Sequence, residues 1–484
     1  MSSIKKNFLY DSILTVSGYI FTLVTFPYVS RVLGVTNIGI CNFVDSVINY
    51  FILFSMLGVS TIGIREIAKK KNDKLELERS FSNIILINAI FTFIALIILV
   101  ALIFIIPDFY KHKELMLIGA FKLIFNFFLV EWFYKGLEDF RYITVRNIAI
   151  RIGYVISVFL FVKETGDYSL YYFLTTLTIV INALINVFHL KSHIRIRMNF
   201  NRNNLKKYLS PIIILGLYGL LASMYTSFNI VYLGFIQGEK EVGYYTTAIK
   251  LYSILFALFA ALTRVMLPRM SSLLSSGNLN EFGKMTNKSY DILLSFSIPL
   301  IIFSIILAPD IIFFLAGEGY EGAILPMQII MPLMLLAGYE QILTMQILTP
   351  LQKDKAIFIN SLLGAVVGIS LNIVLVPLYK SVGSALAWFI SEIIILIFAQ
   401  YFVYKYVKFL FSYKRLLLHL SLAFPAIFGA LLIIRMKSFA PLINILLIGG
   451  FLVCYYTIVQ LKILKNEYFV RIMKKFVLRK NNDL

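Results

Sequence analysis

The chain has 484 residues, of which 60% are hydrophobic and 14% are charged, and its mean hydropathy is +0.85. A soluble domain carries roughly a quarter charged residues, so this composition excludes a soluble globular protein. The net charge of +20 does not indicate nucleic-acid binding, because the basic residues lie in alternate loops between apolar segments. The two cysteines, Cys41 and Cys454, exclude a disulfide framework.

Apolar segments long enough to cross a bilayer, about 20 residues each, recur along the whole chain. In chain order they predict fourteen transmembrane helices, at residues 9–32, 38–63, 81–106, 114–134, 142–162, 168–190, 209–236, 243–267, 289–308, 323–347, 356–378, 382–404, 415–435 and 441–463. Continuous apolar runs favour helices over barrel strands, which alternate over about 10 residues. No small-residue cleavage site follows the first segment, so we expect that helix to be retained. The predicted fold class is an all-α polytopic membrane protein.

The placement of Lys and Arg predicts the orientation of these helices. With the N-terminus inside, 33 of the 45 basic residues fall in inner loops or in the C-terminal tail, and 8 fall at outer ends. Since basic residues concentrate on the cytoplasmic side, we expect both termini to be cytoplasmic and the number of helices to be even.

An internal repeat is visible in the turns between helices. Gly34-Val-Thr-Asn-Ile-Gly39 and Gly238-Glu-Lys-Glu-Val-Gly243 are 204 residues apart, and two Pro-Asp pairs that close spans are 202 apart. Parallel repeats around a central path are common in transporters. We therefore expect two pseudo-symmetric six-helix bundles, followed by two further helices and a basic cytoplasmic tail. The corresponding ranges are 1–207, 208–408, 409–463 and 464–484.

Charged residues inside the predicted spans are costly, at least ~2.5–3.5 kcal/mol at the bilayer centre, and so indicate a hydrophilic chamber. The cations in the spans are candidates to hold phosphate or sugar groups, and they are Lys122, Arg146, Arg151 and Lys250. The acids are candidates to bind a proton or a sodium ion that drives transport, and they are Asp45, Glu131, Glu340 and Glu392. An alternative stays open for three of them, because Glu131 lies near enough to a span end to reach water and Arg146 and Arg151 near enough to join the inner basic belt.

Lys250 lies about a third of the way into its span from the outer end. At that depth its side chain does not easily reach water. Asp45 holds nearly the matching place in the second span. With the repeat offset applied, these two residues would face each other across the chamber as opposed charges. Lys250 is therefore the first candidate for a residue that transport requires.

Several catalytic and cofactor motifs are excluded. Gly317-Glu-Gly319-Tyr-Glu-Gly322 matches a dinucleotide fingerprint, but it connects two spans and lacks the strand that this motif needs. The chain has no phosphate-binding loop of the Walker type, and its four histidines show no metal-ligand spacing. We expect no cofactor and no metal site. Short outer loops without paired catalytic residues indicate a protein that is not an enzyme.

Short motifs between the spans resemble those of polysaccharide transporters of the O-antigen flippase type, in the multidrug/oligosaccharidyl-lipid/polysaccharide exporter superfamily. They are Arg31-Val-Leu-Gly34 to Gly39, Gly58, Gly63-Ile-Arg-Glu-Ile-Ala-Lys69, Trp132-Phe-Tyr-Lys-Gly-Leu-Glu138, Gly319-Tyr320 with Ala323, and Val382-Gly-Ser-Ala385 leading to Glu392. The resemblance covers essentially the whole chain. It rests on the order of the motifs and on the topology more than on any one motif.

The resemblance implies alternating access and export of undecaprenyl-diphosphate-linked repeat units across a bacterial cytoplasmic membrane, for O-antigen, capsule or exopolysaccharide. Relatives hold the diphosphate with cavity cations, for which Lys250 and Arg31 are the best-placed candidates here. We expect a monomer that contacts membrane lipids and the lipid-linked substrate, with polymerase and chain-length proteins of the pathway as candidate partners and no nucleic acid. The sequence leaves open a cation-coupled multidrug antiporter and a polymerase or ligase of the same pathway, as well as the sugar and the coupling ion.

Overall fold

The computed structural model describes residues 3–194, 202–436 and 440–464, and these ranges contain helices and no strand. Of the predicted basic tail, residues 465–484 lie outside the described residues. The chain divides into two compact units. Unit 1 comprises Met1–Thr247, Ala316–Gly319 and Ser361–Ser391, and unit 2 comprises Ala248–Leu315, Tyr320–Asn360 and Glu392–Leu484.

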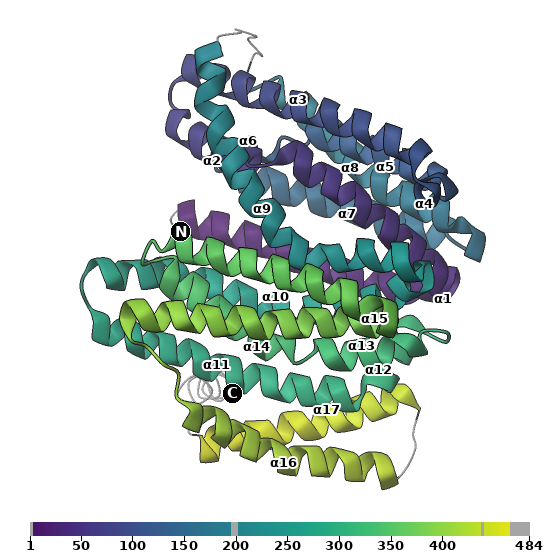
Figure 1. Cartoon of the computed structure of the whole chain (residues 1–484), viewed down its shortest axis with the longest axis vertical. Helices are drawn as coiled ribbons and strands as arrows, with labels where there is room; N and C mark the ends of the chain where they lie inside the picture. The colour runs from purple at the N-terminus through teal and green to yellow at the C-terminus, as the bar shows by residue number, and fades with distance from the viewer. Residues whose placement is uncertain (1–2, 195–201, 437–439, 465–484) are drawn as a thin grey trace, which may run out of the picture. The chain divides into compact units, whose positions relative to one another are not determined.

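Unit 1 is built mainly from the first nine α-helices and the start of the tenth. These elements are α1 (Ser3–Met56), α2 (Val59–Lys70), α3 (Lys74–Ile105), α4 (Pro107–Lys111), α5 (Lys113–Phe127), α6 (Glu131–Gly136), α7 (Phe140–Phe161), the 3-10 helix η1 (Thr165–Asp167), α8 (Tyr168–Leu190), α9 (Arg202–Gln237) and α10 (Glu239–Ser275), which continues into unit 2. Helices α3, α5 and α8 lie side by side, and α1 packs against α3, α5 and α7 (Figure 1).

Unit 2 contains the remaining helices except the middle of α15. They are α11 (Leu279–Ile306), α12 (Ala308–Ala316), the 3-10 helix η2 (Glu321–Ala323), α13 (Ile324–Ile330), α14 (Leu333–Gln341), the π-helix η3 (Ile342–Leu348), α15 (Asp354–Val407), α16 (Tyr413–Met436), α17 (Pro441–Ile458) and the π-helix η4 (Val459–Ile463). Within this unit, α11 packs against α14, α16 and α17, and α16 packs against α17 (Figure 1).

Ten helices in the described part of the chain are long and apolar enough to cross a membrane, or eleven if the bent helix α10 is counted as one more. This number is below the fourteen predicted partly because α15 contains two predicted spans, and α1 contains one and most of the next, which continues into α2. Each is interrupted by one residue with non-helical backbone, Gly34 in α1 (φ 75°, ψ 169°) and Lys380 in α15 (φ 55°, ψ −130°). Both breaks fall between predicted spans.

Large apolar side chains on the outer faces of the helices indicate a lipid environment. Phe93, Ile105, Phe188 and Phe424 are all more than 60% exposed, where a soluble protein would bury them. Together with the long apolar helices, they identify a multi-pass membrane protein.

The core of unit 1 depends on close contact between α2 and α6. Trp132 is buried and stacks on Phe81 of α3, with ring centres 5.3 Å apart. A Cβ on Gly63 of α2 would lie 2.3 Å from the Trp132 ring. Only glycine at this position leaves room for the indole, so two of the motif residues named above form one packing contact.

Candidate functional site

The predicted acid Asp45 and the predicted cation Lys122 form an ion pair between α1 and α5 in unit 1. Asn49, one turn along α1, donates to Asp45 Oδ2 at 3.0 Å and accepts from Lys122 Nζ at 3.4 Å. Tyr172 of α8 donates to Asp45 Oδ1 at 3.4 Å. The Asp45 side chain is 35% exposed and that of Lys122 is 12% exposed. The pair is therefore polar, hydrogen-bonded and reachable from outside the helix packing.

Glu131 and Arg146 form a second ion pair in unit 1, at 2.7 Å between Oε1 and Nη2. The Arg146 side chain is 4% exposed, and it also donates to Asn186 of α8 and lies over the Tyr142 ring at 5.2 Å. Asn186 in turn donates to the carbonyl of Leu129. These contacts surround the break between α5 and α6, so Arg146 stabilises that break, and a role in substrate contact stays a prediction.

Arg151 and Arg31 lie apart from these two pairs. Arg151 Nη1 donates to the carbonyl of Leu14 at 3.0 Å and to Ser17 Oγ at 3.1 Å, so it joins α7 to α1. Arg31 is exposed, and its Nη1 donates to the carbonyl of Pro27 at 2.7 Å. Its role in substrate binding stays a prediction.

The other predicted residues belong to unit 2. Glu340 lies on α14 and is partly exposed, whereas Glu392 lies on α15 and is buried. Asn360 of α15 donates to Glu340 Oε1 at 3.5 Å. Lys250 is partly exposed on α10. Because Lys250 and Asp45 belong to different units, their expected opposition stays a prediction, and the described charge partner of Asp45 is Lys122.

The two glycine segments of the sequence repeat pack against each other within unit 1. A Cβ on Gly39 would lie 1.7 Å from the carbonyl oxygen of Glu239, and a Cβ on Gly243 would lie 2.2 Å from that of Val35. Asn42 donates to Thr246 Oγ1 at 2.9 Å. Asn42 and Thr246 are separated by the 204-residue offset of the repeat, as are Gly39 and Gly243, since a Cβ on Gly39 would lie 3.0 Å from the backbone nitrogen of Gly243. Gly34 and Gly238 also share a positive φ, 75° and 82°, which glycine adopts without steric cost.

Side chains of unit 1 also hold the first turn of α10. Glu239 Oε1 accepts from Lys111 Nζ at 2.5 Å and lies 2.7 Å from His112 Nε2. Glu241 accepts from the backbone N–H of Ser381 at 3.2 Å and from its hydroxyl at 2.5 Å. The start of α10 is thus fixed from both sides beside the glycine contact.

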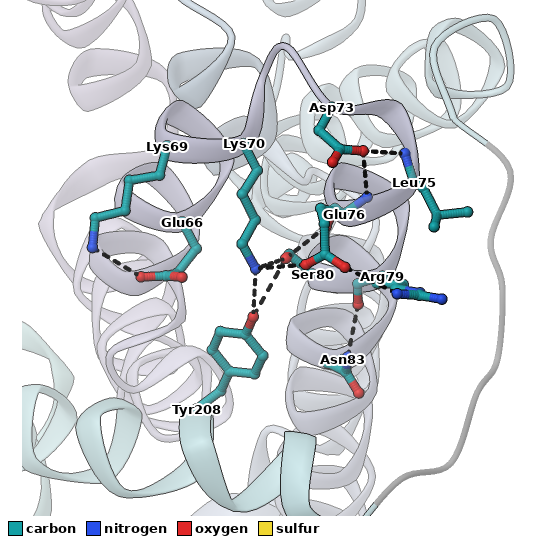
Figure 2. A network of polar contacts seen from close by, with 10 residues as sticks. All are labelled: Glu66, Lys69, Lys70, Asp73, Leu75, Glu76, Arg79, Ser80, Asn83 and Tyr208. Atoms are coloured by element: carbon teal, nitrogen blue, oxygen red, sulfur yellow. Dashed lines mark hydrogen bonds and ion pairs between the residues drawn. The ribbon is translucent and has the colours of Figure 1, made fainter.

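A polar network centred on Lys70 joins α2, α3 and α9 (Figure 2). Lys70 Nζ donates to Ser80 Oγ at 2.6 Å and to Tyr208 Oη at 3.2 Å, and it lies 3.5 Å from the Glu76 carboxylate. Burial works to lower the pKa of Lys70, but the bond to Tyr208 and the charges of Tyr208, Glu76 and Glu66 together raise it. Every contact of Lys70 Nζ that Figure 2 draws is made to a protein side chain, so this network anchors α9.

No group of three or more His, Cys, Asp or Glu side chains that could hold a metal ion occurs among the described residues. The sequence reasoning missed the amide and hydroxyl partners of the charges. Apart from Asn49, which adjoins Asp45 in the sequence pattern, these are Tyr172, Asn186 and Asn360. Their signal was present, because an amide in an apolar span needs a polar neighbour.

Comparisons with known proteins agree with this architecture. The family model described as "Polysaccharide biosynthesis protein" matches residues 4–274. A protein of Escherichia coli (strain K12) named "Putative O-antigen transporter" is 25% identical over 400 residues, which cover 81% of this chain and 95% of that protein.

Two solved structures share the fold. The lipid II flippase MurJ in an inward closed conformation has a TM-score of 0.71 at 18% identity, covering 92% of this chain and 99% of that chain. An inward-facing multidrug resistance MATE family transporter of the MOP superfamily has a TM-score of 0.61 at 12% identity, covering 81% and 94%.

Proposed function

The chain belongs to the polysaccharide biosynthesis protein family, and from that premise we propose that it is a flippase for undecaprenyl-diphosphate-linked oligosaccharide repeat units. It moves them across the bacterial cytoplasmic membrane, without a chemical conversion, for O-antigen, capsule or exopolysaccharide assembly. The observation that carries the proposal is the relative named as a putative O-antigen transporter, whose alignment covers 81% of this chain and 95% of that relative. The multi-pass helical fold, shared with a lipid II flippase, supports it.

We propose fourteen spans with both termini in the cytoplasm. On this count α1 and α15 each cross twice, because a non-helical residue divides each of them. Helices α9 and α10 cross once each, although α9 contains only short apolar stretches and α10 is bent. The distribution of Lys and Arg supports the orientation.

Alternating access between two related six-helix halves is the proposed mechanism. The contact of Gly39 with Gly243 supports it, because the contact joins equivalent positions of the sequence repeat. The hydrogen bond from Asn42 to Thr246 spans the same 204-residue offset.

The proposed substrate contact in unit 1 is Lys122. Its ammonium group already pairs with Asp45. On binding a diphosphate, Lys122 would exchange one anionic partner for another, so no unpaired cation would have to exist in the membrane. Because Asp45 is 35% exposed, water can take over its solvation when the pair opens. Lys250 and Arg31 are proposed as further cations, with Lys250 serving the second half.

Reconstitution tests this function. The purified protein is placed in vesicles with a labelled undecaprenyl-diphosphate oligosaccharide, and a membrane-impermeant glycosidase reports the label on the outer leaflet. We expect the accessible label to rise from about half in protein-free vesicles to nearly all. A fraction equal to that of protein-free vesicles would overturn the proposal, and transport of small drug cations in the same vesicles would establish an antiporter.

A further inference from the structure

A groove in unit 2 lies between α11 and α17, which run side by side (Figure 1). It contains a cavity of about 450 Å³, and the side chains that line it come from α11, α17 and the first turn of η4. Three apolar residues at its rim are exposed, Phe296, Leu446 and Val453. The groove therefore opens onto a surface that faces lipid.

Two glycines of α17 leave space at the apolar end of the groove. A Cβ on Gly449 would lie 3.3 Å from the Phe303 ring of α11, and a Cβ on Gly450 would meet nothing within 4 Å. The other end of the groove is polar, since Ser295, Tyr456, Thr457 and Gln460 line it. An occupant that matches both ends is an amphiphile with an apolar chain and a polar head.

Tyr456 is an independent sign of a ligand at the polar end. Its side chain lines the groove and is 6% exposed. Its hydroxyl is buried and has no hydrogen-bond partner among the described residues, whereas most buried polar groups in proteins have one. An acceptor oxygen on a molecule in the groove would satisfy this hydroxyl.

Positive charge lies just beyond the polar end. Asp291 precedes Ser295 by four residues, about 6 Å along α11, and Arg415 Nη1 donates to both of its carboxylate oxygens, at 2.9 and 2.8 Å. These contacts use Nη1, so the Nη2 and Nε donors of the partly exposed Arg415 can face a phosphate group, which a guanidinium binds well. Lys414 and Lys462 are exposed on α16 and η4. This end of the groove suits an anionic headgroup.

The size of the cavity indicates a fatty-acyl chain. At roughly 30 Å³ for a group the size of a water molecule, the cavity of about 450 Å³ holds about fifteen methylene groups. One acyl chain of a membrane phospholipid has this size. A polyprenyl chain has several times as many carbon atoms and would exceed the cavity.

We propose that this groove binds an anionic phospholipid from the cytoplasmic leaflet. One acyl chain lies along the apolar walls, an ester oxygen accepts from the Tyr456 hydroxyl, and the phosphate contacts Arg415. The leaflet follows from the proposed topology, whereas lipid binding does not depend on the proposed flippase function.

Photolabelling of the full chain in vesicles tests the site without any transport. The probe is phosphatidylglycerol with a diazirine in one acyl chain, and mass spectrometry maps the labelled peptides. We expect label on the groove residues of α11 and α17. A matched phosphatidylcholine probe should label them about fivefold less, because each nearby Lys or Arg favours an anionic lipid.

Two variants and a control test the residues. Gly450→Phe should abolish the label, because the new ring occupies the groove. Gly153→Phe is the matched control, since Gly153 of α7 has the same open surroundings, and it should keep the wild-type label. Tyr456→Phe should lower the label about two- to tenfold, because it removes one hydrogen bond and keeps the ring.

The contrary outcomes are distinct. Label spread evenly over lipid-facing helices, or label that Gly450→Phe leaves unchanged, would overturn the site. Equal labelling by the two phospholipid probes would overturn the anionic headgroup. Removal of the label by undecaprenyl phosphate, and not by unlabelled phosphatidylglycerol, would assign the groove to a polyprenyl chain and overturn the proposal. If Gly450→Phe does not fold, Tyr456→Phe decides, and wild-type label in that variant would overturn the site.

Discussion

Replacing Gly39 with alanine perturbs the contact between the two repeated segments most directly. The new Cβ would lie 1.7 Å from the carbonyl oxygen of Glu239, 2.7 Å from its carbonyl carbon and 3.0 Å from the backbone nitrogen of Gly243. All three are backbone atoms, so no side-chain rotation relieves the clash. Favourable contact between carbon atoms begins near about 3.5 Å, so α1 and α10 must separate by roughly 1–2 Å at this point.

Two effects oppose each other in this variant. Alanine in a helix gains up to about 1 kcal/mol over glycine. Overpacking costs about 1–3 kcal/mol, and more where the backbone is the obstacle. The clash therefore outweighs the helix propensity. We expect the contact between the two glycine segments to be destabilised by at least ~1.4 kcal/mol, which lowers the population of molecules that form it about tenfold. Gly243→Ala should act alike, because its Cβ would lie 2.2 Å from the Val35 carbonyl oxygen.

Cross-linking measures this population. Cysteines replace Asn42 and Thr246, whose side chains are 2.9 Å apart, in a chain without the native Cys41 and Cys454. A short thiol-specific reagent should link them at least about tenfold more slowly in the Gly39→Ala background. Gly153→Ala is the matched control, because a Cβ there meets nothing within 4 Å. Equal rates in the Gly39→Ala and Gly153→Ala backgrounds would refute the reasoning.

Four further substitutions test the polar contacts. Lys122→Met should lower the flipping rate in vesicles. Asp45→Asn removes a partly exposed counter-ion worth ~0–1 kcal/mol, so it should tighten substrate binding by up to about fivefold. Equal effects of the two substitutions would contradict a substrate-binding role of the Lys122 cation. Arg146→Met should cost about 2–4 kcal/mol in unfolding free energy. This is less than the ~3–5 kcal/mol for breaking a fully buried ion pair, because the Glu131 side chain is 29% exposed. Unchanged thermal stability would contradict this prediction. Lys70→Met should cost about 1–2 kcal/mol for two lost hydrogen bonds. Since the pKa of Lys70 is raised, the wild-type advantage should persist at neutral pH and be lost only as pH rises above about 10.4 through that raised pKa; loss near pH 7 would contradict it.

Helices bounded by clear local signals were predictable from the sequence. Helix α8 covers Tyr168–Leu190, the predicted span, because the charged turn before it and the basic segment after it fix both ends. The break between α5 and α6 was not predicted. It occurs inside the predicted span 114–134, where Val130 has a φ of 39°. The hydrogen bond from Asn186 to Leu129 comes from a helix distant in sequence.

The candidate charges could be found by type but not by partner. Asp45 and Lys122 are 77 residues apart, and only the packing of α1 on α5 brings them together. The repeat offset pointed to Lys250, which belongs to the other unit, so that pairing stays a prediction. Sequence spacing relates equivalent positions and carries no information on which helices touch. The glycine segments were the exception. Their spacing indicated a symmetric pair, and Gly39 and Gly243 are in contact.

Deletion of the gene, followed by analysis of lipid-linked intermediates, tests the central claim most directly. The flippase account predicts loss of surface polysaccharide, with complete repeat units trapped on the cytoplasmic leaflet and recovery on complementation. Single repeat units accumulating on the outer leaflet would contradict it and indicate a missing polymerase. Intact surface polysaccharide with altered drug sensitivity would contradict it equally.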